Sequence, residues 1–207
     1  EGNNFDYVQI EFSDLESVQK GSNELIELVS SKYGGKIDYL FNNAGIHYGG
    51  PIGLLEKDLT TKQGYDQCFV TNYLGHFLMT EKLLPSITNT KESRIIQMSS
   101  TFHWHTNGSM LLPTKNEKGV TIPHAARGDL KDLRMRLLAY GNSKLAQVMH
   151  TQSLQKRLDS AGNSNNVKVV SACPAWVGTS IVPDGPLRKF LHYFAFPPNQ
   201  GIYSTLM

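Results

Sequence analysis

The chain has 207 residues, which suits a single domain spanning 1–207 with a substantial hydrophobic core. Its 20 basic and 18 acidic residues nearly balance, which excludes the basic surface of a nucleic-acid-binding protein. Its apolar runs are well short of the roughly 20 residues that cross a bilayer, and its 2 cysteines are too few for a disulfide framework.

The first half of the chain alternates strand patterns with helix patterns. Residues 6–12 are rich in β-forming side chains and predict a strand. A helix is expected next, from Ser13 as its N-cap to the glycine pair at 34–35. An apolar strand at 36–45 then ends in a glycine turn, and apolar residues recur at helical spacing between Gln63 and Leu84.

The second half continues the alternation. Residues 93–100 predict a third strand, whereas Thr101 to Arg134 show no sustained period and predict a long loop. A helix from about Leu137 to Asp159 and a strand at 166–176 follow. The remaining residues predict a short amphipathic segment at 186–196 and the start of another helix at 197–207.

This order of elements predicts an α/β fold. Strands separated by helices are typical of a Rossmann-like, doubly wound parallel sheet with helices on both faces. In such sheets the ligand lies beyond the carboxyl ends of the strands. The segments to inspect are therefore Asn42 to Gly45, Ser99 to Thr101, and Cys173 to Thr179.

Three motifs occupy these strand ends, and each has an ordinary structural explanation beside a functional one. In "NNAG", the small residues Ala44 and Gly45 let adenine or ribose approach the backbone, although a plain turn has the same composition. A serine of "MSS" can donate to a carbonyl oxygen or cap a turn. In "CPAWVGTS", backbone groups after Pro174 could hold a nicotinamide carboxamide and Thr179 could reach a phosphate, or the segment is a plain loop.

Tyr140 and Lys144 stand four residues apart on a predicted helix, so their side chains share one face. Simple packing of a phenol on a lysine stem would satisfy this spacing. A phenol with a pKa near 10 is a poor base at neutral pH, and lowering its pKa to about 7 needs roughly 4 kcal/mol. A nearby ammonium and a positively charged nicotinamide ring both favour the phenolate. The pair is therefore a candidate proton-transfer device.

Five blocks in a fixed order make the pattern specific. They are "NNAG", Asn72 within "TNYLGHF", "SS", "YGNSK" and "PAWVGTS". In this order and on these elements, the chain resembles the classical short-chain dehydrogenase/reductase family over nearly its whole length. The residue patterns of "TNYLGHFLMTEKLLP" and "AYGNSKLAQ" are most similar to those of the retinol dehydrogenase-like branch.

The resemblance implies a role for each matching residue. Tyr140 would be the general acid in reduction and the base in oxidation. Lys144 would lower the pKa of Tyr140 and bind the nicotinamide ribose. Ser100 would hold the substrate oxygen, and Asn72 would order a water relay near Lys144.

The resemblance also implies a cofactor site. Its expected lining residues are Asn42, Ala44, Gly45, Pro174, Val177 and Thr179, together with Tyr140 and Lys144. In the family an acidic residue before the first helix of this chain meets adenine. Glu11 is placed there, with the backbone N–H of Phe12 beside it, and Asp14 is the rival. An aspartate is usual at this position, so Glu11 is a departure.

A larger departure concerns the glycine-rich TGxxxGxG turn that seats the pyrophosphate in this family. That motif does not occur, and the first predicted strand corresponds to the family's third. An N-terminal βαβ unit of about 30 residues and the C-terminal strand are thus absent from the chain as given. Either the sequence is part of a longer protein, which we favour, or the protein is a reduced relative that no longer binds a dinucleotide.

The leading hypothesis is an oxidoreductase acting on a lipophilic alcohol or ketone, such as a retinoid, a steroid or another lipid-derived carbonyl. The resemblance implies NADP as the cofactor, with NAD as the alternative. A non-catalytic structural subunit or binding module is a second hypothesis, and an epimerase or dehydratase a third that the "NNAG" turn disfavours.

Further expectations concern partners and location. A homodimer through the two long helices, or a place in a larger assembly, is a hypothesis. We expect the 187–196 segment to cover an apolar substrate and to touch a membrane surface, so a cytoplasmic and an organelle-membrane location both stay open. "HWH" at 103–105 is expected to be a loop or pocket wall, because no third metal ligand is evident.

Overall fold

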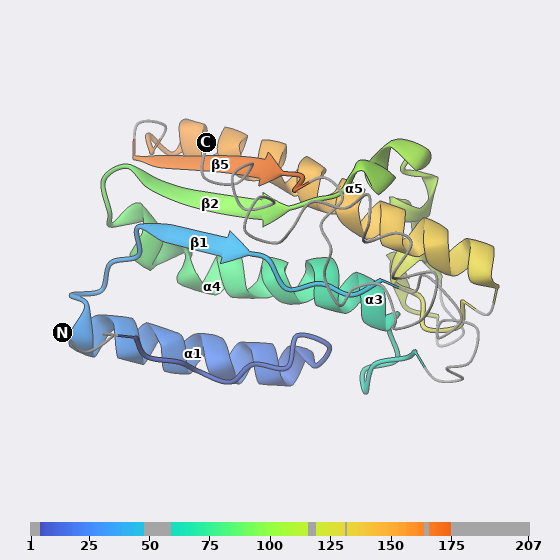
Figure 1. Ribbon diagram of the computed structural model, residues 1–207, viewed down its shortest axis with the longest axis horizontal. Coiled ribbons are helices and arrows are strands. Elements are labelled where there is room, and N and C mark those ends of the chain that lie inside the picture. Colours follow the sequence, from blue (N-terminus) through green and yellow to red (C-terminus); the bar gives the residue numbers. More distant parts are fainter. Residues whose placement is uncertain (1–4, 48–58, 116–118, 131, 164–165, 175–207) are drawn as a thin grey trace, which may run out of the picture.

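The computed structural model describes residues 5–47, 59–115, 119–130, 132–163 and 166–174. Three strands, β1 (Tyr39–Asn42), β2 (Ser93–Met98) and β5 (Val167–Ala172), form a parallel sheet in the order β1-β2-β5 (Figure 1). Helices connect the strands, because neighbouring parallel strands need a long crossover. The prediction of an α/β, Rossmann-like parallel sheet is therefore confirmed, whereas helices on both of its faces stay a prediction.

The register of the sheet brings the ends of its strands level. Asn42 pairs with Gln97, and Gln97 pairs with Ser171 on the next strand. Since all three strands are parallel, the segments that follow them leave the sheet at one edge. The three strand-end motifs are therefore brought to the same side of the molecule.

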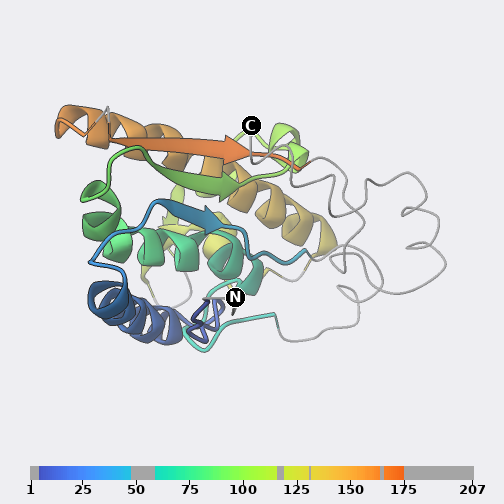
Figure 2. The ribbon, with the colours of Figure 1, turned by 60° about the vertical axis from the view of Figure 1, so that its left-hand side comes forward.

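The long helices form a layer beside the sheet. α4 (Gly75–Thr88) and α5 (Leu133–Ser160) pack against the strands, and α1 (Leu15–Lys32) packs against α4 (Figures 1 and 2). On the opposite face of the sheet, Tyr39, Phe41 and Val170 are exposed. Among the residues that the structure describes, no helix covers that face.

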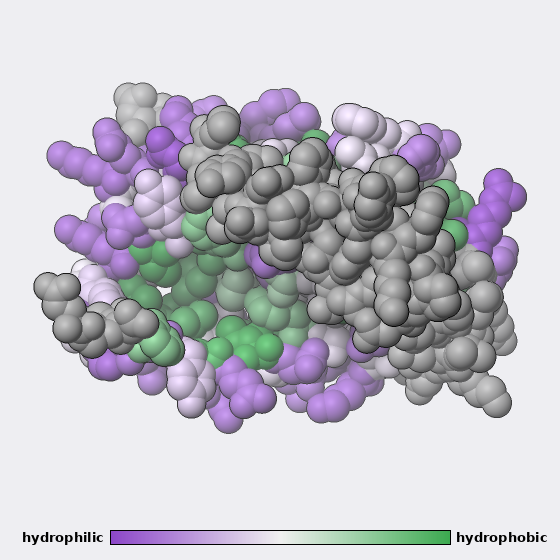
Figure 3. Space-filling model, in the orientation of Figure 1, coloured by the Kyte–Doolittle hydropathy of each residue, from purple (hydrophilic) through white to green (hydrophobic). Residues whose placement is uncertain are grey.

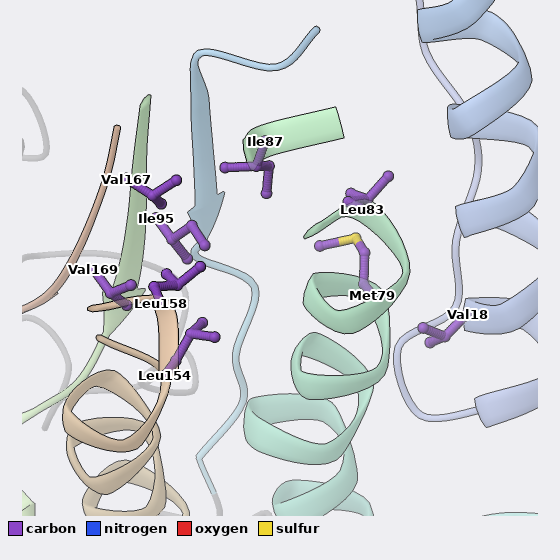
Figure 4. Packing of buried hydrophobic residues seen from close by; sticks show 9 residues of the cluster. All are labelled: Val18, Met79, Leu83, Ile87, Ile95, Leu154, Leu158, Val167 and Val169. Atoms are coloured by element: carbon purple, nitrogen blue, oxygen red, sulfur yellow. The ribbon is translucent and has the colours of Figure 1, made fainter. Parts of the chain in front are cut away.

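The apolar core lies between the sheet and this helix layer. Its nine buried residues come from α1, α4, β2, α5 and β5, and Figure 4 shows how they are arranged. Burial of such aliphatic side chains contributes about 1.5–3 kcal/mol each. The core residues are Val18, Met79, Leu83, Ile87, Ile95, Leu154, Leu158, Val167 and Val169.

The predicted strand at 6–12 is wrong. The segment precedes α1 in the chain, has no strand pairing and runs alongside that helix (Figure 1). The side chains of Lys32 and Tyr33, at the end of the helix, each donate to the Asp6 carboxylate at 2.7 Å. A strand exists only through its ladder of hydrogen bonds, and no described strand runs beside this segment. Apolar side chains gather in a hollow between the sheet and α1 (Figure 3).

The helix predicted after that segment is confirmed as α1, but its N-cap is Asp14 and not Ser13. The Asp14 carboxylate accepts from the backbone N–H of Glu16 at 3.1 Å. Ser13 instead donates its hydroxyl to Glu11 at 2.7 Å. Both are good capping residues, so the choice depends on where the chain enters the helix.

The helical pattern between Gln63 and Leu84 is confirmed with one irregularity. It consists of α3 (Gln67–Phe69), a π-helical turn at Val70–Leu74, and α4. In the π turn, the N–H of Gly75 bonds the carbonyl of Val70, five residues back. Such turns are rare in proteins, and those that do occur are frequently found at functional sites.

The region from Thr101 to Arg134 is less irregular than predicted. Its described residues form three 3₁₀ turns and a short antiparallel strand pair, which are too short to show a sustained hydrophobic period. Among the described residues, no helix is long and apolar enough to cross a membrane. The elements are η2 (Thr101–His105), η3 (Ser109–Leu111), β3 (Pro113–Lys115), β4 (Thr121–Pro123) and η4 (His124–Ala126).

Candidate active site

The carboxyl ends of β1 and β2 meet one face of α5. The Lys144 ammonium donates to the carbonyl oxygen of Met98 at 2.9 Å. In return, the Ser99 hydroxyl donates to the carbonyl oxygen of Lys144 at 2.9 Å. These two bonds fix α5 against the end of β2, so the predicted Tyr140–Lys144 pair does face the edge where ligands bind in such folds.

Tyr140 is buried beside aromatic rings. Its side chain is 5% exposed, and the His47 ring stands edge-on to it with centroids 4.2 Å apart. The ring of Phe102 lies at 5.6 Å on the η2 side. Burial raises the pKa of Tyr140 to about 12, although a side-chain hydrogen bond with Ser100 acts to lower it. Ser100 and Tyr140 are thus in direct contact, and the predicted hold of Ser100 on the substrate oxygen stays a prediction.

Lys144 is also buried, and burial lowers the pKa of its ammonium to about 8. Its Nζ lies 5.8 Å from the centre of the Tyr140 ring. Low polarity disfavours both charged forms, the phenolate and the ammonium. The surroundings built by this chain therefore keep the phenol protonated at neutral pH, and the expected lowering of its pKa requires a further positive charge nearby.

Ser100 serves two purposes at once. Its hydroxyl accepts from the backbone N–H of Phe102 at 3.3 Å as the N-cap of η2, and its side chain also bonds Tyr140. The carbonyl oxygen of Ser100 is held by the His103 ring. Capping and substrate contact were posed as alternatives from the sequence, and this geometry is compatible with both.

Asn72 is fully buried in the π turn and joins three elements. Its Oδ1 accepts from the N–H of Ile46 at 2.8 Å, and its Nδ2 donates to the carbonyl of Ile46 at 3.0 Å. The same Nδ2 reaches the Ser143 hydroxyl at 3.1 Å. Asn72 therefore fastens the segment after β1 to α5. Its implied part in a water relay stays a prediction.

The "NNAG" turn passes directly over the Tyr140–Lys144 face. A Cβ added to Gly45 would stand 3.2 Å from Asn72 Oδ1 and 3.4 Å from Lys144 Nζ, so glycine permits this close approach. The Asn42 amide donates to the Thr80 hydroxyl at 2.8 Å, and the Ala44 carbonyl meets His76 Nε2 at 2.8 Å. The turn is thus held by α4, while Ala44 and Gly45 remain exposed.

The proposed adenine end of the site lies at the start of α1. The ring of Phe12 packs on His76 with centroids 4.3 Å apart, which places Phe12 near Ala44. Glu11 is exposed, and hydrogen bonds from Ser13 lower the pKa of its carboxyl. Its rival Asp14 caps α1 and also binds Lys62 at 2.8 Å. Glu11 therefore has the more accessible carboxylate of the two.

The third strand end is described only in part. Pro174 is half-buried just after β5. Its neighbour Cys173 lies close enough to influence the pKa values of both Tyr140 and Lys144. Val177, Thr179 and the segments at 186–196 and 197–207 lie outside the described residues. Among the described residues, no group of three potential metal ligands occurs, and "HWH" is the 3₁₀ turn η2.

Four residues beside the site were missed from the sequence. They are His47, which packs on Tyr140; Cys68, whose Sγ lies 3.3 Å from Asn72 Nδ2; His76; and Gln147. Helical spacing could have found two of them, because Cys68 stands four residues before Asn72 and Gln147 three after Lys144. Cysteine is commonly buried, whereas the burial of Gln147 has no comparable signal in the sequence.

The comparison with protein families agrees with this geometry. Residues 1–110 match the family described as short chain dehydrogenase. The parallel sheet with its connecting helices is the fold that the resemblance implied. The chain therefore belongs to the short-chain dehydrogenase/reductase family of oxidoreductases.

Named relatives lie within the same family. An uncharacterised oxidoreductase of Schizosaccharomyces pombe is 28% identical over 97% of this chain and 55% of its own length. Human retinol dehydrogenase 11 is 29% identical over 81% of this chain and 46% of its own length. The chain thus spans about half the length of the curated relatives that it matches.

The fold recurs in solved structures. An NADPH-bound carbonyl reductase from chicken fatty liver superposes with a TM-score of 0.58. The alignment covers 96% of this chain and 67% of that protein, at 19% identity. At this identity the likeness establishes the fold.

Proposed function

We propose that the protein moves a hydride between a nicotinamide dinucleotide and a lipophilic alcohol or ketone. The observation that carries the proposal is the meeting of Ser100, Tyr140 and Lys144 beneath the "NNAG" turn. A neutral phenol, hydrogen-bonded to a serine hydroxyl and excluded from water, is suited to give a proton to a carbonyl oxygen. Membership of an oxidoreductase family supports the same reaction class.

The residues at the strand ends fit the proposed cofactor. Ala44 and Gly45 present an exposed turn without bulky side chains, directly above Lys144. When bound there, the nicotinamide would supply or accept the hydride. Lys144 would bind its ribose, and the other expected contacts are Glu11, Phe12, Asn42, Pro174, Val177 and Thr179. NADP is the proposed form, with NAD as the alternative, and the NADPH-bound carbonyl reductase of the same fold is in keeping with it.

Tyr140, Ser100 and Lys144 have distinct roles in the proposed reaction. In reduction, the Tyr140 hydroxyl transfers its proton to the carbonyl oxygen as the hydride arrives at carbon. The Ser100 hydroxyl holds that oxygen in place. The positive charge on Lys144 stabilises the phenolate that Tyr140 becomes, which offsets part of the penalty of burying it.

The walls around Tyr140 favour an apolar substrate. His47 and Phe102 pack directly on the phenol ring, and Trp104 stands 73% exposed on the same 3₁₀ turn as Phe102. Apolar walls with a few polar groups are typical of small-molecule sites. Retinoids, steroids and other lipid-derived carbonyls are the proposed class, in keeping with similarity to a human retinol dehydrogenase. The family comparison does not favour the non-catalytic alternative.

The decisive variant is Tyr140→Phe in the full-length protein. Phenylalanine keeps the ring contacts and removes the proton, so NADPH-dependent reduction of a lipophilic ketone should fall by about 10²- to 10⁴-fold. Tyr39→Phe is the matched control, because Tyr39 is 58% exposed on β1 and should leave turnover unchanged. Undiminished turnover by Tyr140→Phe would remove the proposed acid, and failure of wild-type protein to bind NADPH would support the non-catalytic alternative.

A further inference from the structure

The π turn beneath the site alters how its carbonyl groups are paired. A π turn bonds each carbonyl to the N–H five residues ahead instead of four, which widens the helix and opens a carbonyl to donors from outside. Here the turn spans Val70–Leu74 and has Asn72 at its centre. The carbonyl oxygen of Asn72 accepts a hydrogen bond from a neighbouring helix, from Gln147 Nε2 of α5 at 2.7 Å.

Gln147 lowers the stability of the folded state at this position. Its side chain is fully buried, and its Oε1 has no hydrogen-bond partner. A buried, unpaired amide oxygen costs about 1–3 kcal/mol. An aliphatic side chain would avoid that cost, so the useful part of Gln147 is its donor, which meets the Asn72 carbonyl.

Only a few contacts separate the Gln147–Asn72 hydrogen bond from Lys144. Asn72 holds both the N–H and the carbonyl of Ile46, at 2.8 and 3.0 Å, and reaches Ser143 on α5 at 3.1 Å. Gly45, the residue before Ile46, lies above Lys144 Nζ. Gln147 and Lys144 are on the same helix, three residues apart. The Gln147–Asn72 bond therefore closes a loop of contacts around the turn that covers Lys144.

We propose that Gln147 is a positioning residue for the proposed oxidoreductase reaction. It fixes the Asn72 backbone in the π turn, and Asn72 in turn fixes the height of the Asn42–Ile46 segment above Lys144 and Tyr140. Gln147 touches neither substrate nor cofactor in this role. The inference rests on the proposed function for its kinetic consequences, but its geometric consequence is independent of activity.

The first test replaces Gln147 by leucine, which fills the same space and cannot donate. In the full-length protein, Gln147→Leu should lower kcat about tenfold with a smaller change in the KM for the ketone, because misplacement acts on the transition state. Gln155→Leu is the matched control. Gln155 lies on the same helix and donates to the backbone carbonyl of Val167 at 3.3 Å, far from the site, so its loss should leave kcat unchanged.

The second test uses Gln147→Glu as a pH-dependent donor. A buried carboxyl has a raised pKa, and only its protonated form can donate to the Asn72 carbonyl. The kcat of this variant should approach that of wild type at low pH and fall as the carboxyl ionises. Gln147→Leu should show no such recovery. A Gln147→Glu profile parallel to that of Gln147→Leu would overturn the proposal.

The third test needs no turnover. Hydrogen exchange at the Ile46 amide, which Asn72 Oδ1 accepts, should be about tenfold faster in Gln147→Leu than in wild type and unchanged in Gln155→Leu. Unchanged exchange at Ile46 together with unchanged kcat would refute the positioning role. If wild-type protein proved inactive while Gln147→Leu still accelerated exchange, the proposed function would fail and the positioning role would stand.

Discussion

The two halves of α5 are built on opposite principles. Its C-terminal half buries Leu154 and Leu158 in the apolar core with Ile95 and Val169 (Figure 4). Its N-terminal half buries Tyr140, Ser143 and Lys144, and the buried Gln147 follows at the midpoint of the helix. The first set lowers the free energy of the folded state, whereas the second raises it wherever a charge or an amide oxygen lacks a partner.

The difference shows which part of the fold carries buried polar groups that cost stability. Several buried polar atoms without partners lie in or beside the site half, including Asn42 Oδ1, His47 Nε2, His76 Nδ1 and Gln147 Oε1. The core cluster contains only apolar side chains. Sites that violate the usual packing rules are commonly functional. Substitutions in the two halves should therefore change stability with opposite signs.

The largest expected effect is at Asp66, a buried carboxyl that caps α3 and faces the N-terminal half of α5. Burial raises the pKa of its carboxyl from 3.8 to about 7, so the native state binds the extra proton between these values and stability falls as pH rises through them. Asp66→Asn keeps the acceptor for Phe69 N–H and removes the charge. It should stabilise the protein by up to about 4 kcal/mol at pH 8 and by almost nothing at pH 4, measured by urea unfolding.

A flat difference between Asp66→Asn and wild type across this pH range would contradict the assigned burial cost. Arg136 is the basic group whose charge faces Asp66 and acts to lower its pKa. The double variant with Arg136→Gln would show how much of the cost that charge already offsets.

The apolar side is probed by Leu154→Ala. Leu154 is 2% exposed in the core, so its truncation should destabilise the protein by about 3 kcal/mol through lost burial and a cavity. The kcat of the folded fraction should stay unchanged, because Leu154 lies two turns beyond the site. A kcat loss comparable to that of Tyr140→Phe would mean that the two halves of α5 are not separable.

The smallest effect is expected at Lys144. Burial lowers the pKa of its ammonium from 10.5 to about 8, so the unfolded chain binds more protons between these values and stability rises as pH increases through them. Lys144→Met removes a cost of about 3 kcal/mol and loses the bond to Met98, worth about 1, for a net gain of about 2 kcal/mol at pH 7.

The free energy of unfolding of Lys144→Met should also lack the rise between pH 8 and 10.5 that is expected of wild type. Turnover should fall together with this gain in stability. A variant that is both less stable and still active would place Lys144 among ordinary packing residues.

Much of the fold was accessible from the sequence, because hydrophobic periods report burial. The apolar runs around Leu40, Ile95 and Val169 became β1, β2 and β5, and the period between Gln63 and Leu84 became a helix. The segment at 6–12 failed because its composition permits a strand and only a paired neighbour creates one.

The site was predictable where motifs stand at strand ends and less so inside the helices. Tyr140, Lys144 and Ser100 meet as their positions imply. The capture of the Asn72 carbonyl by Gln147 was not foreseen, because glutamine in a helix is normally exposed and the π turn has no signature in the sequence. The raised pKa of Tyr140 was also not foreseen, since the depth of burial depends on the packing of Phe102 and His47.

The π turn at Val70–Leu74 has a consequence for insertions and deletions in this chain. One π turn is equivalent to an α-helix with one residue inserted, and each residue of an α-helix rotates its neighbours by about 100°. Deleting a single residue here would restore regular winding, and the flanking turns would keep nearly their present orientation because the wider turn takes up the rotation of its extra residue. What the deletion would remove is the extra residue of the turn that carries the Asn72 carbonyl, and with it the setting in which Gln147 binds that oxygen.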